Sequence, residues 1–192
     1  LGDVYKRQTA NGAIDTTFGT NGVTPLPNKL ADNSRRFAQV GTSIALASDG
    51  TLRIGGVETS YKVRYDSDST TTYEDVTGRM MFVTALNANG TVNTSFGNEG
   101  TYRLALPKGQ EYAGRRSALQ PLDNGSVLFG YGLDNRSQFV VVGSVGGGSG
   151  VQRTSGERDG VPNAFFKLPD GRLIVDLSLI HLSEPTRRYA IS

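Results

Sequence analysis

A twelve-residue pattern occurs twice in this chain, and it constrains the fold more than any other feature. The first copy, Asn-Gly-Ala-Ile-Asp-Thr-Thr-Phe-Gly-Thr-Asn-Gly, begins at Asn11, and the second, Asn-Gly-Thr-Val-Asn-Thr-Ser-Phe-Gly-Asn-Glu-Gly, begins at Asn89. A turn-rich signature that recurs in this way is typical of stacked modules, each of which needs neighbours to bury its apolar side. The chain is therefore predicted to consist of related β units.

The residue types inside the pattern suit a structural role. Phe18 and Phe96 supply a large apolar surface for a junction between units. Asp15 and Asn93 precede hydroxyl residues, and such side chains bond nearby backbone donors in an Asx turn. Glycine permits positive φ where a β-carbon would clash, and the pattern holds four such positions, Gly19, Gly22, Gly97 and Gly100. We interpret these residues as structural and assign no ligand to them.

Three further stretches predict β-hairpins on one plan. Residues 43–47 and 51–54 alternate apolar and polar side chains around Asp49 and Gly50, a pair that favours a type I′ turn. The same arrangement surrounds Gly125 and Gly171. No stretch has helical periodicity long enough to compete, so we predict an all-β fold of antiparallel strands.

The positions of matching residues indicate how long one unit is. Phe82 matches Phe139, and Gly100 matches Gly160, and both spacings predict a period of roughly sixty residues. The longer interval between the two copies of the pattern then places an insertion at 57–78. Four short strands per period are what a propeller blade requires, although a β-solenoid would give a similar sequence.

These residues together resemble a known family, the delta-60 repeat of bacterial exported proteins. The resemblance covers residues 9–176, with units at about 9–90, 91–150 and 151–176, the last one partial. It implies a β-propeller-like array and a non-catalytic binding or scaffold role in a secreted or cell-surface protein. The chain departs from the family where Ser48 replaces the usual proline before the turn, and where Gly156 replaces the phenylalanine of a third copy.

The two ends of the chain resemble translated sequencing-adaptor sequence. Codons that encode Val-Tyr-Lys-Arg-Gln at 4–8 have a reverse complement that encodes Leu-Ser-Leu-Ile-His at 177–181. A mirrored pair of this kind is typical of the inverted ends of a transposon adaptor. We therefore assign 1–8 and 177–192 to adaptor sequence and leave them out of the fold prediction.

Composition excludes several classes of function once the ends are set aside. Removing the ends lowers Lys+Arg from 20 to 16 and Asp+Glu from 18 to 16, so the net charge changes from +2 to 0. A neutral chain gives no reason to expect nucleic acid as a partner. No apolar run is long enough for membrane insertion.

The remaining residues hold no Cys, His or Trp, which excludes thiolate nucleophiles, imidazole bases and the common zinc ligands. The expected partners are a protein or a glycan, together with further repeats of the same parent chain.

Two groups of carboxylates are the remaining chemical candidates. Asp66, Asp68, Glu74 and Asp75 lie in the predicted insertion, where their oxygens would suit calcium, and a solvated loop is the alternative. Glu111, Asp123 and Glu157 are the acidic residues that a hydrolase acting on polysaccharide would need to bring together. We predict no catalytic residue and no cofactor, with that carboxylate-dependent enzyme as the alternative.

Overall fold

The regular structure of this computed structural model is entirely β-strand over the residues that it describes. Those residues are 4–26, 28–32, 35–65, 72–106, 112–133, 136–145, 148–153, 158–178 and 188–191. The strands are β1 (Val4–Lys6), β2 (Val23–Pro25), β3 (Asn28–Asp32), β4 (Arg35–Leu46), β5 (Leu52–Tyr65), β6 (Thr72–Leu86), β7 (Thr101–Ala105), β8 (Tyr112–Pro121), β9 (Val127–Leu133), β10 (Arg136–Val145), β11 (Gly148–Arg153), β12 (Arg158–Asp159), β13 (Val161–Lys167), β14 (Leu173–Ser178) and β15 (Arg188–Ile191).

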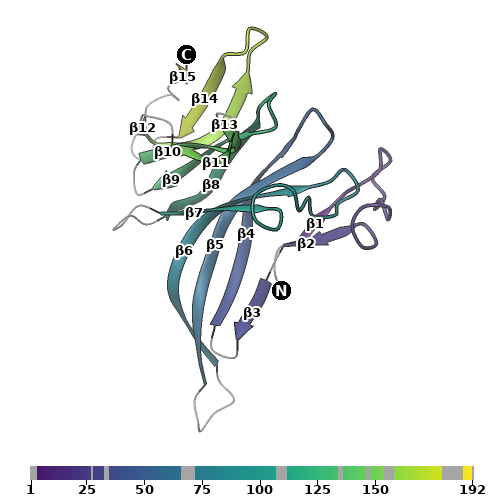
Figure 1. The fold of residues 1–192 in the computed structure, drawn as a ribbon, viewed down its shortest axis with the longest axis vertical. Coiled ribbons are helices and arrows are strands. Elements are labelled where there is room, and N and C mark those ends of the chain that lie inside the picture. Colours follow the sequence, from purple (N-terminus) through teal and green to yellow (C-terminus); the bar gives the residue numbers. More distant parts are fainter. Residues whose placement is uncertain are drawn as a thin grey trace.

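The strands form four antiparallel sheets that come one after another along the chain (Figure 1). The first sheet holds β1 and β2, the second β3 to β7, the third β8 to β12 and the fourth β13 to β15. Strands adjacent in sequence are adjacent in each sheet, except that β12 pairs with β10. Tight turns favour this order because they can join only antiparallel strands. The prediction of an all-β antiparallel fold is confirmed.

Five turns in the described chain share one geometry. In each turn the first residue donates its amide to the carbonyl of the fifth at 2.8 Å, and the fourth residue is a glycine with φ between 77° and 86°. The third residue is Asp or Asn, whose Oδ1 accepts the amide hydrogen of the fifth residue. The five glycines are Gly12, Gly50, Gly90, Gly125 and Gly171.

This geometry corrects the predicted turn type. A type I′ turn needs positive φ at both central residues, but Asp49 does not have it and Gly50 does. The hairpin instead has a type I turn followed by a left-handed glycine, the common three-residue loop. The Asx bond from the Thr51 amide to Asp49, at 2.9 Å, holds the aspartate in the ordinary φ range.

The two copies of the sequence pattern have matching backbones. The carbonyls of Asp15 and Asn93 each accept the amide of the phenylalanine three positions later at 3.1 Å. Asn21 and Glu99 both have positive φ, at 52° and 51°. The strands on either side also match, since Val4 lies opposite Pro25 as Phe82 lies opposite Arg103. Each copy therefore connects two adjacent antiparallel strands of one sheet.

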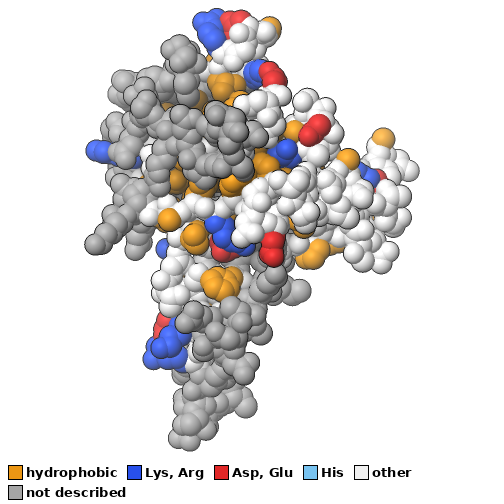
Figure 2. Space-filling view, viewed as in Figure 1, with side chains coloured by type: hydrophobic (Ala, Val, Ile, Leu, Met, Phe, Trp, Pro, Cys, Tyr) orange, Lys and Arg blue, Asp and Glu red, His pale blue; other side chains and the backbone are white. Residues whose placement is uncertain are grey.

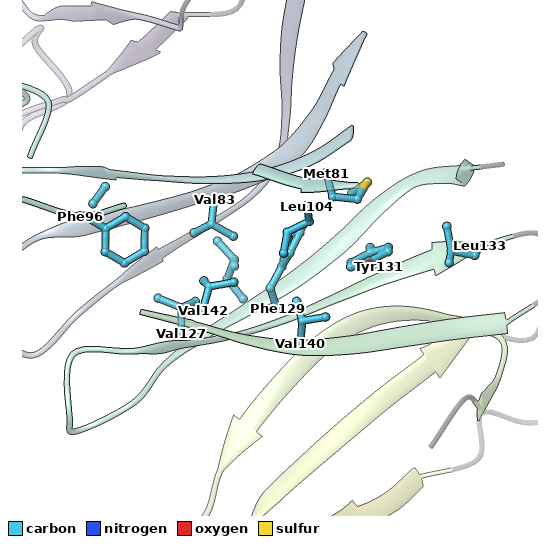
Figure 3. Packing of buried hydrophobic residues seen from close by; sticks show 12 residues of the cluster. Met81, Val83, Phe96, Leu104, Val127, Phe129, Tyr131, Leu133, Val140 and Val142 are labelled. Atoms are coloured by element: carbon cyan, nitrogen blue, oxygen red, sulfur yellow. The ribbon is translucent and has the colours of Figure 1, made fainter. Parts of the chain in front are cut away.

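Apolar side chains fill the spaces between successive sheets. The largest cluster joins the second sheet to the third, and Figure 3 shows Met81, Val83 and Leu104 of the second sheet facing Phe129 and Val140 of the third. A second cluster lies between the first and second sheets, and a third between the third and fourth. The second and third sheets are thus buried on both faces over part of their area, which stabilises the stack because apolar surface leaves water on each side.

The first sheet packs on the second in the way that β6 and β7 pack on the third. Phe18 and Leu26 are buried against the second sheet, and their counterparts Phe96 and Leu104 are buried against the third. Phe18 is 1% exposed and Phe96 8%. An arginine guanidinium lies 4.9 Å from the centre of each ring, Arg7 over Phe18 and Arg53 over Phe96. The two phenylalanines therefore occupy similar surroundings.

The predicted insertion at 57–78 is mainly strand. β5 and β6 stay paired from Leu52 opposite Leu86 to Tyr65 opposite Thr72. The extra length therefore lengthens a hairpin, and the long strands β4, β5 and β6 extend away from the other sheets in Figure 1. The solvated loop that was the alternative to a calcium site is wrong for the paired part of this segment, because cross-strand pairing, with one irregularity between Ser60 and Tyr61, satisfies its backbone.

The two spacings that predict a period of roughly sixty residues, Phe82 to Phe139 and Gly100 to Gly160, do not join structurally equivalent positions. Phe82 packs toward the first sheet, whereas Phe139 packs toward the fourth. Thr101 follows Gly100 into a strand paired with the preceding β6, but Val161 follows Gly160 into a strand paired with the following β14. The third copy, at 154–160, thus differs from the others in the pairing of the strand after its last glycine, and residues 154–157 lie outside the described chain.

Both ends assigned to adaptor sequence contribute strands. β1 pairs with β2, and β15 pairs with β14. Residues 4–8 therefore take part in the packing described above, while their adaptor origin stays a prediction. Within the part of the chain that the structure describes, no helix has the length and apolar character needed to cross a membrane.

Candidate functional site

A groove of about 620 Å³ lies on the face of the second sheet that is turned toward the first sheet. It is bordered by β4 to β7 and by the second copy of the sequence pattern. In Figure 2, apolar side chains reach the surface between charged ones over the middle of the molecule. The residues that line the groove are Phe37, Glu58, Met80, Val92, Thr94, Asn98, Glu99, Thr101 and Arg103.

Strand register places these side chains together. Gln39, Glu58 and Met80 lie opposite one another on β4, β5 and β6 and therefore form a row across the sheet. Arg103 on β7 lies opposite Phe82, the second residue after Met80, so it shares their face of the sheet. The groove thus depends on the pairing of four successive strands, which brings together side chains as far apart in sequence as Phe37 and Arg103.

A buried polar network forms one wall of the groove. Glu58 is 6% exposed, and its Oε2 accepts a hydrogen bond of 2.7 Å from Nε2 of Gln39. Nε of Arg103 lies 3.1 Å from both Glu58 oxygens. The Arg103 side chain is 38% exposed, so the ion pair joins a buried anion to a cation at the groove surface. A buried carboxylate needs such partners, because an unpaired one would cost several kcal/mol.

The second copy of the pattern forms the opposite wall. Thr101, the first residue of β7 after this copy, shares a hydrogen bond of 2.8 Å with Thr84, and their hydroxyls are buried. Glu99 is exposed and has a left-handed backbone, which the equivalent Asn21 also adopts. Gly100 leaves room for Val92, because a β-carbon there would lie 2.3 Å from the valine Cγ1. This wall therefore requires glycine at position 100 and presents the polar side chain of Glu99 at its surface.

The structure supports the expected roles of the acidic and amide residues in the pattern. Oδ1 of Asp15 accepts the Thr17 hydroxyl at 2.6 Å and the Thr17 amide at 3.0 Å. These bonds, the hydroxyl first, hold the pKa of the Asp15 carboxyl below its usual value. Oδ1 of Asn93 makes the same two bonds to Ser95, at 2.6 and 3.2 Å. Both residues close Asx turns.

The glycines of the pattern have the predicted positive φ, between 57° and 86°. At Gly19 a β-carbon would lie 2.3 Å from the Val23 carbonyl oxygen, and at Gly97 it would lie 2.6 Å from that of Thr101. At Gly22 it would lie 2.2 Å from the Ile14 side chain. Close backbone approach, together with the φ angle, therefore explains these glycines.

The predicted calcium residues are not brought together in the described chain. Asp66 and Asp68, and the side chain of Glu74, lie outside the residues that the structure describes. Asp75 pairs instead with Arg64, with Oδ2 and Nη2 2.6 Å apart. The described segments contain no cluster of three or more metal-ligating side chains.

The acidic residues considered for a hydrolase lie away from the groove or outside the described chain. Glu111 and Glu157 belong to the undescribed segments. Asp123 is exposed and pairs with Lys167 at 2.7 Å, beside a second hollow of about 470 Å³ near the hairpin turns. Nothing in the sequence distinguishes Glu58, Glu99 or Arg103 from other charged residues, because only the pairing of β5, β6 and β7 brings them to one surface. No family model, curated protein or solved structure matches this chain.

Proposed function

We propose that this chain is a segment of a propeller-like array from a bacterial secreted or cell-surface protein, with a non-catalytic binding or scaffold role. The observation that supports the array is the matching contact of the first sheet with the second and of β6 and β7 with the third. A stack of this kind can be continued by further units of the same type. The resemblance of residues 9–176 to the delta-60 repeat of bacterial exported proteins supports the secreted or cell-surface location.

The state of Glu58 favours binding over catalysis in the groove. Both of its oxygens are engaged by Arg103, and one of them also by Gln39. A carboxylate held in this way positions a cation and is poorly suited to exchange protons with a substrate. The groove therefore offers a fixed polar surface and an apolar wall, which together suit recognition.

A carboxylate-dependent enzyme acting on polysaccharide is the second candidate function. The observation that favours it is that Glu58 and Glu99 line the same groove. Glycoside hydrolysis uses two carboxyl groups, one on each side of the scissile bond. The candidate pair differs from the acidic residues considered in the sequence.

One experiment separates the two candidates. The chain would be applied to arrays of glycans and proteins, and each glycan that it binds would be incubated with it and assayed for new reducing ends. Capture of a partner without cleavage is the expected result. New reducing ends that disappear in the Glu99→Gln variant would establish the hydrolase instead, and failure to capture any partner would contradict a binding role.

A further inference from the structure

We propose that the groove binds a neutral sugar ring, with Arg103 as its principal hydrogen-bond donor. This inference rests on the proposed binding function and names its ligand class. It depends on four features of the groove: a fixed donor, the balance of charge, an apolar wall, and the contrast with the first copy of the pattern.

Arg103 presents donors in a fixed direction. Its Nε is held by both oxygens of Glu58 at 3.1 Å, and Glu58 is itself held by Gln39. The Nη1 and Nη2 groups have no hydrogen-bond partner among the described residues, and the side chain is partly exposed. A planar guanidinium with two free amino groups matches two adjacent acceptor oxygens, as in a vicinal diol or a carboxylate.

The charge of the groove decides between those two ligands. Among the described residues of the lining, Glu58 and Glu99 contribute two negative charges and Arg103 one positive charge, so together they carry a net charge of −1. An anionic ligand would be repelled by Glu99. A neutral diol avoids this repulsion, because its hydroxyl oxygens accept from Arg103 and its hydroxyl hydrogens can be donated to the Glu99 carboxylate.

The rest of the lining suits the two kinds of surface that a sugar ring has. Phe37 and Met80 give an apolar wall against which the C–H face of a pyranose can pack. The side chains of Thr94 and Asn98 are exposed and make no hydrogen bond within the described chain, so both are available to ring hydroxyls. The volume of about 620 Å³ lies within the range of small-molecule sites, roughly 300–1,000 Å³.

The first copy of the pattern shows that the fold does not require these polar residues. It has the same backbone but carries Asn21 and Pro25 where the second copy carries Glu99 and Arg103. The turn needs a residue that tolerates positive φ, and asparagine meets that need at lower cost than glutamate. Glu99 and Arg103 are therefore additions to the motif, and both face one groove.

The test is a titration of the whole, ¹⁵N-labelled chain with cellohexaose, maltohexaose and xylohexaose, followed by NMR. For at least one sugar, the amide signals of residues 92–103 should shift, and those of residues 14–25 should not. Arg103→Lys keeps the charge beside Glu58 and removes the planar donor pair, so affinity should fall by about tenfold or more. Thr94→Val should weaken binding as well, whereas Thr16→Val, the matched change in the first copy, should leave it unchanged.

Several results would overturn the proposal. These are the absence of shifts with all three neutral sugars, wild-type affinity in both groove variants, or tighter binding of hexagalacturonate than of any neutral hexamer. Amide dispersion of each variant reports whether it is folded. Capture of a protein or an acidic glycan at another surface, together with no shifts from the neutral sugars, would leave the binding role intact and refute the sugar assignment.

Discussion

Replacing Gly90 by alanine should show how strongly the two copies of the pattern hold each other. Gly90 has a φ of 85°, and a β-carbon there would lie 2.6 Å from the Gly19 amide nitrogen and 2.8 Å from the Phe18 ring. The Gly19 amide also donates to the Asn89 carbonyl at 2.7 Å, and the Thr24 hydroxyl donates to the Gly90 carbonyl at 2.7 Å. The added methyl group must therefore disturb a junction between segments that are distant in sequence.

The expected loss of stability in Gly90→Ala has two separate causes. Holding an alanine in the left-handed conformation destabilises the folded state by about 1–2 kcal/mol. Alanine also restricts the unfolded chain more than glycine does, which reduces this cost by about 0.4–1 kcal/mol. Overpacking against a backbone atom and a buried ring adds about 1–3 kcal/mol. Gly90→Ala should thus lower the free energy of unfolding by about 2–4 kcal/mol.

Gly12→Ala is the matched control. Gly12 has the same turn geometry and a φ of 86°, but a β-carbon there meets nothing within 4 Å. Its cost should be about 1 kcal/mol, that of the φ angle alone. Urea denaturation of both variants would measure the difference. Equal losses of stability would refute the proposed junction, and so would a larger loss for Gly12→Ala.

Three further predictions concern the core, the turns and the groove. Phe18→Ala and Phe96→Ala should each cost about 3–5 kcal/mol in thermal or urea unfolding, because both rings fill junctions between sheets, and a negligible cost for either would contradict that role. Asp15 and Asp49 have pKa values below the ordinary 3.8, because hydroxyls and amides of Thr17 and Thr51 bond their carboxylates. Their contribution to stability is therefore present above about pH 4 and is lost as the pH falls through the lowered values. The Asp49→Asn variant, which copies the amide at Asn124, should lose less stability than wild type between about pH 5 and pH 3 in a series of unfolding curves; identical pH profiles would argue against the turn as the source. Arg103→Ala should cost about 2–3 kcal/mol because it leaves Glu58 without its cation, a figure reduced for the partial exposure of Arg103, whereas the double change Glu58→Met with Arg103→Met should stay within about 1 kcal/mol of wild type. A double variant that is less stable than Arg103→Ala would contradict this account of the pair.

The local part of the fold could be predicted from sequence because it depends on short-range chemistry. An Asp or Asn before a glycine defines each of the five turns, and the side-chain oxygen and the positive φ act within a few residues. The turn type was still wrong at Gly50. The same residue pair suits a type I′ turn and a type I turn followed by a left-handed glycine, and only the pairing of the flanking strands distinguishes them.

The arrangement of side chains across the sheets could not be predicted in the same way. Side chains alternate between the faces of a strand, so a comparison that is displaced by one residue exchanges the two sides. Phe82 and Phe139 show this, because they match in sequence and pack in opposite directions. The strands within the insertion at 57–78 could not be predicted for a related reason, since its polar residues give no sign of the partner strand with which they pair.

The groove shows most clearly that contacts between strands could not be predicted from the sequence. Glu58 and Arg103 are 45 residues apart, and each is an ordinary charged residue in its own stretch of sequence. The order β5, β6, β7 places them on one face, and burial then requires them to pair. The spacing of Glu58 and Arg103 in the sequence therefore does not predict that contact.

The amino-acid sequence by itself determined the strand-forming stretches, the turns between them and the likeness of the segments that begin at Asn11 and Asn89, because these depend on the nearest neighbours along the chain. Only the tertiary structure decided which faces are buried, where the long hairpin pairs and which polar side chains meet in the groove. The physical reason is that burial and ion pairing depend on distances in space, which strand register and sheet stacking create.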